Sequence, residues 1–225
     1  MSTLRKKRLE RPGAPGGKRD ENRRRRVQAL KKAGLDLFLA RGIETVTIDE
    51  IAARAKMAKG GFYLYFADKP ALVDAILAPL RDAAIAAFAQ AEDAIAAAAD
   101  RESLLLAYGM LGAGLGAAVV GDPQAAQLYL QESRGPKSGA RAPARKLADR
   151  IRARSLELTH LAHDRGLLRP FDPRISALAV VGAAEAMLGA LLAEEDLGNP
   201  FELPEKLTGL FMDGLKPRDR GIAAL

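Results

Sequence analysis

The residues best suited to bind a charged partner lie in one short segment of this 225-residue chain, Ala58–Tyr65, with the sequence Ala-Lys-Gly-Gly-Phe-Tyr-Leu-Tyr. Lys59 can donate hydrogen bonds to a phosphate or to the edge of a guanine. Gly60 and Gly61 have no side chain that would hold the backbone away from DNA. These residue types, placed together, indicate contact with a nucleic acid.

Four more side chains near this segment can bind the same kind of partner. Tyr63 and Tyr65 carry hydroxyl groups on rigid stems, and the hydroxyl of Thr47 can cap a helix and also contact DNA. Lys69 lies at the start of the next expected helix, where its charge adds to the helix dipole and favours a bound phosphate. We predict that all four take part in DNA binding.

Local signals place these residues on helices. Helical periodicity over Arg23–Arg41 ends at Gly42, a residue that tolerates the left-handed conformation of a C-terminal cap. Thr47 and Glu50 form a capping box, which predicts a short helix from Ile48 to about Ala55. A second short helix is expected over 58–65. Two short helices after a longer one describe a helix-turn-helix, whose second helix enters the DNA major groove.

The charge of the chain is concentrated in its first third. Residues 1–66 hold 17 Lys and Arg against 7 Asp and Glu, a net charge of +10, and residues 67–225 hold 18 against 21, a net charge of −3. We expect residues 1–20 to form a flexible basic extension. The run Arg23–Arg26 is either a solvated face or a phosphate clamp. This asymmetry favours a polyanionic partner for the first third, although a basic tail that only aids solubility fits it equally.

The composition favours helices and argues against catalysis. Ala and Leu dominate and β-branched residues are scarce, so we predict an all-α protein. With no Cys, disulfides, thiolate metal sites and cysteine nucleophiles are excluded. Glu157, His160 and His163 drift around their helix, which makes shared metal ligation poor. We therefore expect no metal, no cofactor and no enzymatic activity.

One motif imitates a cofactor site. Gly112-x-Gly114-x-x-Ala117, with Glu132 further along, resembles a dinucleotide-binding fingerprint. That fingerprint requires a preceding strand within a βαβ unit, and the residues before Gly112 predict a helix. The motif is therefore dismissed as a cofactor site.

Two apolar stretches, Ser103–Val120 and Ile175–Ala193, are nearly long enough to cross a membrane. Ala and Gly supply much of both and contribute little to insertion, and Glu185 would lie near the middle of the second span. Gly112 and Gly116 form a GxxxG pattern in the first stretch. We therefore predict buried helices that pack closely through small residues, and no membrane partner.

The rest of the chain is expected to form five or six longer helices. Asp68 and Pro70 begin one helix, and a separate Ala-rich helix is expected from Pro79 or Asp82. The remaining expected helices span 101–120, 123–132, 144–166, 172–194 and 204–215, and a loop covers 133–143.

The segment from Ala29 to Leu72 resembles the DNA-binding domain of the tetracycline-repressor (TetR) family, and the ending Tyr63-x-x-Phe66-x-x-Lys69 agrees with that family. The resemblance implies an N-terminal three-helix helix-turn-helix domain over 21–68. It also implies a C-terminal helical bundle over 69–225 that binds a small ligand and dimerises through its last two long helices, by position 174–194 and 204–215.

Two residues depart from the family pattern. Ala58 stands where the family usually has Ser or Thr as a helix cap, and Gly61 stands where it usually has a small hydroxylated residue or Ala. A missing cap costs about 0.5–2 kcal/mol, and a Gly pair adds roughly 1–2 kcal/mol of local destabilisation. We therefore predict a loosely ordered recognition helix in the free protein. Phe62 and Phe66 are expected to be core residues.

The implied function is a ligand-responsive, cytoplasmic transcriptional regulator, most simply a repressor. It would bind a palindromic DNA operator as a homodimer and be released by a small-molecule effector. Activation by the same fold, or a small-molecule-binding bundle with a vestigial DNA-binding domain, are the alternatives. The candidate ligand-binding residues come from the middle helices: Phe88, Leu105, Tyr108, Tyr129 and Glu132.

Overall fold

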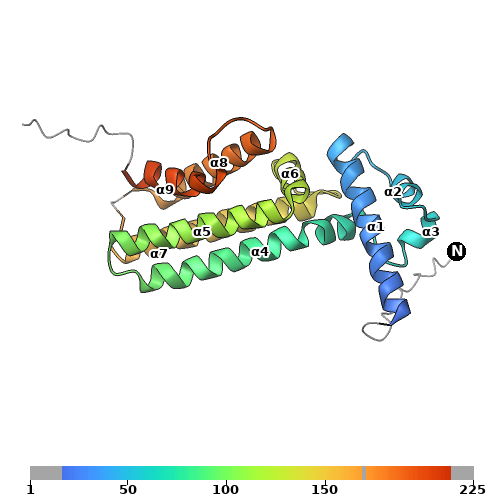
Figure 1. Ribbon diagram of the computed structural model, residues 1–225, viewed down its shortest axis with the longest axis horizontal. Helices are drawn as coiled ribbons and strands as arrows, with labels where there is room; N and C mark the ends of the chain where they lie inside the picture. The colour runs from blue at the N-terminus through green and yellow to red at the C-terminus, as the bar shows by residue number, and fades with distance from the viewer. Residues whose placement is uncertain (1–16, 169–170, 214–225) are drawn as a thin grey trace, which may run out of the picture. The chain divides into compact units, whose positions relative to one another are not determined.

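The computed structural model describes residues 17–168 and 171–213, and within these ranges the chain is helical without a strand (Figure 1). The all-α prediction is therefore confirmed for the described residues. The helices are α1 (Lys18–Arg41), α2 (Ile48–Arg54), α3 (Lys59–Phe62), α4 (Lys69–Ala97), α5 (Arg101–Gly121), α6 (Pro123–Glu132), α7 (Ala142–Asp164), α8 (Pro173–Leu192) and α9 (Leu203–Asp213), with a 3₁₀ turn at Pro200–Glu202.

The chain divides into two compact units. The first contains residues 1–83 and 118–151, and the second contains residues 84–117 and 152–225. The division predicted from sequence, 21–68 and 69–225, follows function rather than compactness and stays a prediction. Of the predicted extension, residues 1–16 lie outside the described part, whereas residues 18–20 form the first turn of α1.

The core of the first unit is built by α1, α2, α3, α6 and the start of α4. Leu30, Phe38, Ile51, Phe62 and Leu72 are all fully buried there. Helix α1 packs against both α2 and α6, and α2 packs against α3. This core sets how the short helices α2 and α3 are presented.

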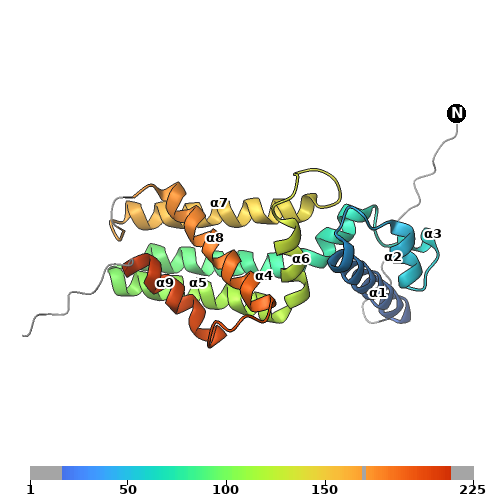
Figure 2. The same cartoon turned by 90° about the horizontal axis from the view of Figure 1, so that it is seen from above.

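In the second unit, α4, α5, α7, α8 and α9 contribute long helical segments (Figure 2). Arg154 on α7 donates to Glu92 on α4 at 2.9 Å, and Arg165 donates to the carbonyl of Ala98 at 2.7 Å. Helix α8 packs against α9. These contacts join α7 to α4 and α9 to α8.

Helix ends follow the predicted caps. Thr47 accepts a hydrogen bond from the backbone N–H of Glu50, and the Glu50 carboxylate accepts one from the N–H of Thr47, so the capping box is present. The carboxylates of Asp68, Asp122 and Asp172 each accept hydrogen bonds from backbone N–H groups in the first turns of α4, α6 and α8. These local predictions are confirmed.

Helix α4 corrects one prediction. Pro79 was expected to begin a new helix, but it lies inside the continuous α4. A proline inside a helix costs about 3 kcal/mol because it removes a backbone donor and crowds the preceding turn. Buried Ile76, Leu77 and Leu80 continue the same apolar face across this position, and their burial offsets that cost.

Helices α5 and α8 correct another prediction. They are the two helices of the described chain that are long and apolar enough to cross a membrane, which is weak evidence for a span. In the most apolar 18-residue stretch of each helix, only 11% is buried in α5 and 17% in α8, so the prediction of buried helices is wrong for the single chain. The large exposed residues of the two helices are Leu106, Met110 and Val120 on α5, with Ile175 and Leu178 on α8.

The small residues of α5 do allow close packing. A Cβ atom at Gly114 would lie 2.8 Å from the Cβ of Ala87, and one at Gly112 would lie 2.5 Å from that of Pro204. A Cβ atom at Gly116, in contrast, would meet nothing within 4 Å beyond the backbone of its own helix. Close packing therefore uses Gly112 and Gly114, not the expected pair of Gly112 and Gly116.

Candidate nucleic-acid interface

The turn between α2 and α3 is built by local hydrogen bonds and one left-handed residue. Lys56 adopts a φ of +55°, a conformation that is costly for a residue with a side chain. The N–H of Met57 donates to the carbonyl of Ala52 at 2.8 Å and closes the turn. Lys56 was not among the predicted site residues, and its side chain is exposed just before the start of α3.

Helix α3 is shorter than expected, because it spans Lys59–Phe62 and not the whole of 58–65. Ala58 makes no capping hydrogen bond with its side chain, as its chemistry requires. Residues 63–65 form a turn in which the N–H of Tyr65 donates to the carbonyl of Phe62 at 3.0 Å. The missing cap and the two glycines explain the short helix; its order in solution stays a prediction.

The predicted DNA contacts differ in how far they reach solvent. Thr47 is exposed, Lys59 keeps 60% of its side chain exposed, and Tyr63 is half-buried. Gly60 and Gly61 are half-buried as well. Tyr65 is only 9% exposed, so the structure places it in the core, with Phe62 and Phe66.

Lys59 is held by a neighbour on α2. Its Nζ lies 3.0 Å from the carboxylate of Asp49, and both side chains are 60% exposed. The hydrogen bond with Asp49, supported by its charge, raises the pKa of Lys59 above its ordinary value. The pair ties the start of α3 to α2 and partly neutralises a cation that was predicted to contact DNA.

The pKa of Glu50 is lowered by neighbours in the same region. Hydrogen bonds from the backbone and side chain of Thr47, followed by one from Arg41, lower the pKa of Glu50 from 4.5 to about 2. The Glu50 carboxylate therefore stays ionised far into the acid range, so the cap is present at every pH at which DNA binding would be measured.

An open hollow with a volume of about 650 Å³ lies beside α3. Two exposed cations border it, Arg26 from α1 and Lys56 from the turn. Its other lining residues are Met57, Ala58, Gly61, Leu64 and Tyr65. The structure thus places one member of the basic run Arg23–Arg26 next to the short helix, which the sequence left open.

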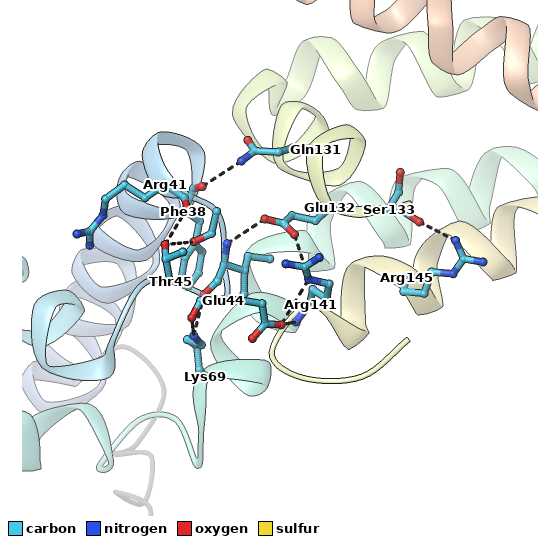
Figure 3. A network of polar contacts seen from close by, with 12 residues as sticks. Phe38, Arg41, Glu44, Thr45, Lys69, Gln131, Glu132, Ser133, Arg141 and Arg145 are labelled. Carbon is cyan, nitrogen blue, oxygen red and sulfur yellow. Dashed lines mark hydrogen bonds and ion pairs between the residues drawn. The ribbon is translucent and has the colours of Figure 1, made fainter. Parts of the chain in front are cut away.

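Lys69 has a different place from the phosphate site predicted for it. Its Nζ donates to the backbone carbonyls of Ile43, Glu44 and Val46 at 2.7, 3.2 and 2.8 Å (Figure 3). An ammonium group has three N–H donors, so these carbonyls account for all of them. Lys69 holds the loop between α1 and α2, residues 42–46, from the start of α4.

Glu132 also makes contacts other than the ligand contact predicted for it. This ligand-binding candidate ends α6 with only 4% of the residue exposed. Its Oε1 accepts a hydrogen bond from the backbone N–H of Ile43 at 2.9 Å. The adjacent Gln131 donates its side-chain amide to the carbonyl of Phe38 at 3.4 Å. The end of α6 is thus bonded to the end of α1 and the loop after it (Figure 3).

Arg141, just before α7, completes this network. Its Nε lies 3.4 Å from the carboxylate of Glu132 and 3.5 Å from that of Glu44. Its backbone N–H donates to the carboxylate of Glu44 at 3.1 Å. No sequence signal connects these residues, because they lie up to 97 positions apart.

The remaining ligand-binding candidates fall in both units. Phe88, Leu105 and Tyr108 belong to the second unit, whereas Tyr129 belongs to the first and is buried there. Phe88 is 2% exposed, and burial raises the pKa of Tyr108 to about 12. Their role in ligand binding stays a prediction.

The residues that the structure describes include no group of three or more His, Cys, Asp and Glu side chains that could hold a metal ion. In the segment with Glu157, His160 and His163, the Glu157 carboxylate accepts a hydrogen bond from Arg154 at 2.7 Å.

Known proteins match the chain in sequence and in fold. The model of the family described as "Bacterial regulatory proteins, tetR family" matches residues 30–76. An uncharacterized HTH-type transcriptional regulator, YdeS of Bacillus subtilis, is 37% identical over 68 residues. That match covers 30% of this chain and 33% of YdeS, so the chain spans about a third of its curated relative.

Solved structures match most of the chain at low identity. The transcriptional regulator FadR from Bacillus subtilis, in complex with stearoyl-CoA, has a TM-score of 0.63 at 15% identity and covers 84% of this chain and 99% of its own. NalD, the secondary repressor of the MexAB-OprM multidrug efflux pump in Pseudomonas aeruginosa, has a TM-score of 0.64 at 18% identity, with 86% and 97% covered. At these identities the likeness establishes the fold. The chain thus resembles the tetR family of bacterial regulatory proteins in sequence over residues 30–76, and its fold resembles those of the regulators FadR and NalD over most of its length.

Proposed function

We propose that this protein is a cytoplasmic, ligand-responsive transcriptional repressor that binds operator DNA as a homodimer. The observation that carries the proposal is the helix-turn-helix of α2 and α3, which lies inside the segment that matches the tetR family. Lys59, Thr47 and half-buried Tyr63 supply polar groups along it, and Arg26 and Lys56 add two cations beside α3. This is the charge and shape that contact with phosphates and a major groove requires.

Exposed apolar side chains on the last two helices support a homodimer. Ile175 and Leu178 on α8 are 55% and 59% exposed, and Leu210 on α9 is 45% exposed. Contact with a second copy would remove these side chains from water. A twofold dimer carries two equivalent reading helices, so its operator is expected to be palindromic, with half-sites about 34–36 Å apart.

The effector is expected to be a small molecule with a long apolar part. FadR, which shares the fold, was solved with stearoyl-CoA, so acyl-CoA thioesters are the first compounds to test. Phe88, Leu105 and Tyr108 in the second unit are the candidate apolar and polar contacts. A ligand that binds more tightly to a dimer whose two reading helices are spaced differently from the half-sites shifts the population toward that dimer. Operator binding then weakens in proportion to the ligand's difference in affinity for the two dimer conformations.

The first test is to recover genomic DNA fragments that the purified protein retains and to measure their affinity. A shared palindromic sequence is expected. Lys59→Ala and Tyr63→Ala should weaken binding without unfolding the protein, and Lys59→Ala should reduce the slope of log affinity against log salt by about 0.9. Lys137→Ala is the matched control, because it removes an exposed Lys outside the helix-turn-helix and outside the proposed dimer helices, and that Lys pairs with Asp149 at 3.0 Å as Lys59 pairs with Asp49.

Two outcomes would contradict the proposal. The DNA assignment fails if no fragment is retained, or if both interface variants bind with unchanged affinity and salt dependence. A reporter placed behind the recovered operator separates a repressor from an activator, since deleting the regulator raises expression in the first case and lowers it in the second. Sedimentation of the purified protein tests the dimer.

A further inference from the structure

The loop between α1 and α2, residues 42–46, is held by three separate elements of the first unit (Figure 3). Lys69 on α4 binds three of its carbonyls, as described above. Glu132 on α6 binds the N–H of Ile43, and Arg141 before α7 binds Glu44. The loop leads directly into Thr47, the cap of α2. Any displacement of the loop therefore reaches the helix-turn-helix within one residue of its first cap.

Glu132 is the most demanding of these contacts. A buried carboxylate is costly unless it is hydrogen-bonded or paired, and Glu132, at 4% exposure, is both hydrogen-bonded and paired here. One oxygen binds the Ile43 N–H at 2.9 Å, and the other lies 3.4 Å from Arg141. A change in the position of α6 would either draw the loop along or leave a buried charge without its partner.

The geometry around the carboxylates leaves little room for an alternative arrangement. A Cβ atom at Gly42 would lie 3.4 Å from the Glu132 carboxylate, and Gly42 has a φ of +80°. A Cβ atom at Gly139 would lie 2.6 Å from the Glu44 carboxylate, and Gly139 has a φ of +76°. Glycine at both positions lets the backbone approach the two acids that share Arg141.

From these contacts we propose that Glu132 is a positioning residue for DNA binding, which holds the loop 42–46 from the end of α6 and so sets the position of α2. This inference rests on the proposed function, because it names a residue that positions the DNA-binding helices. Glu132 would then act on DNA through Ile43 and would not contact either the DNA or the effector.

The first test measures amide hydrogen exchange of peptides that cover residues 42–47, in the wild type, Glu132→Gln and Glu132→Ala. Loss of a hydrogen bond to a charged group should speed exchange of the loop by roughly ten- to a hundredfold in Glu132→Ala. Glu132→Gln keeps an oxygen that can accept from Ile43 but loses the charge that attracts Arg141, so a smaller increase is expected. Ile95→Ala is the control for lower stability, because Ile95 is fully buried in the second unit, whereas the loop and the groups that hold it belong to the first.

The second readout is affinity for the recovered operator fragment. Glu132→Ala should bind about tenfold more weakly with an unchanged salt slope, since no phosphate contact is removed, and Glu132→Gln should recover most of the loss. The inference is overturned if loop exchange in both Glu132 variants matches that of Ile95→Ala, or if Ile95→Ala loses as much operator affinity. If the wild type retains no DNA, the proposed function fails, while the exchange of the loop still decides whether Glu132 holds it.

Discussion

Replacing Lys69 by Met separates two roles for one cation. The substitution keeps most of the apolar stem and removes the ammonium group that donates to the carbonyls of Ile43, Glu44 and Val46. If Lys69 holds the loop, the variant should lose stability and keep its phosphate contacts. If Lys69 instead binds a phosphate, as the sequence predicts, the variant should keep its stability and lose one such contact.

The expected loss of unfolding free energy in Lys69→Met follows from the three hydrogen-bond distances. Two of the hydrogen bonds are short, at 2.7 and 2.8 Å, and the third is 3.2 Å. A hydrogen bond to a charged group contributes about 1.5–3 kcal/mol. Because one ammonium serves all three carbonyls, the contributions do not simply add, and a total loss of about 2–4 kcal/mol is expected. With a urea slope of about 2 kcal/mol per molar, the midpoint should fall by about 1–2 M.

The assay combines urea unfolding, followed by circular dichroism, with operator binding at several salt concentrations. Lys59→Ala is the matched comparison, because its ammonium pairs with Asp49 at the surface, where both side chains are 60% exposed, and its removal should leave the midpoint nearly unchanged. Lys69→Met should lower the midpoint and keep the salt slope, and Lys59→Ala should do the reverse. A Lys69→Met midpoint within about 0.3 M of the wild type, together with a salt slope reduced by about 0.9, would refute the loop role.

Three further predictions concern stability. Gly114→Ala should destabilise the protein by about 1–3 kcal/mol, because its Cβ would lie 2.8 Å from Ala87 of α4. Gly116→Ala should stabilise α5 by roughly 0.5–1 kcal/mol, because a Cβ there would have open space around it. Thermal melts of the two variants test this contrast. Lys56→Gly should raise the urea midpoint, since glycine relieves the left-handed φ of +55°, and an unchanged or lower midpoint would count against strain at the turn. The capping box with Thr47 keeps the pKa of Glu50 at about 2, below its ordinary 4.5. The ionised Glu50 carboxylate therefore contributes stability above pH 4.5, and this contribution is lost as the pH falls toward 2. Glu50→Gln should lose less stability than the wild type over this pH range in an acid unfolding titration.

Features that depend on a few neighbouring residues were predictable. The capping box of Thr47, the caps at Asp122 and Asp172, and the extent of α2 all follow from contacts within one helical turn. The missing cap at Ala58 was predicted too, but the length of the recognition helix was not, because a helix was expected over 58–65 and α3 ends at Phe62. Such signals act between residues three or four positions apart, and they persist whatever the rest of the chain does.

Features that depend on the direction and packing of a side chain were not predictable. Glu132 and Lys69 both carry the right chemistry for the roles predicted for them, yet both turn to the loop 42–46, at separations of 89 and 23–26 positions. A new helix was predicted to begin at Pro79 or Asp82, and burial on both sides of Pro79 keeps α4 whole. Local chemistry determines which bonds a residue is able to make. Which of them it does make is decided by the groups that folding brings to it, because a buried charge goes to the partner that best offsets the loss of water.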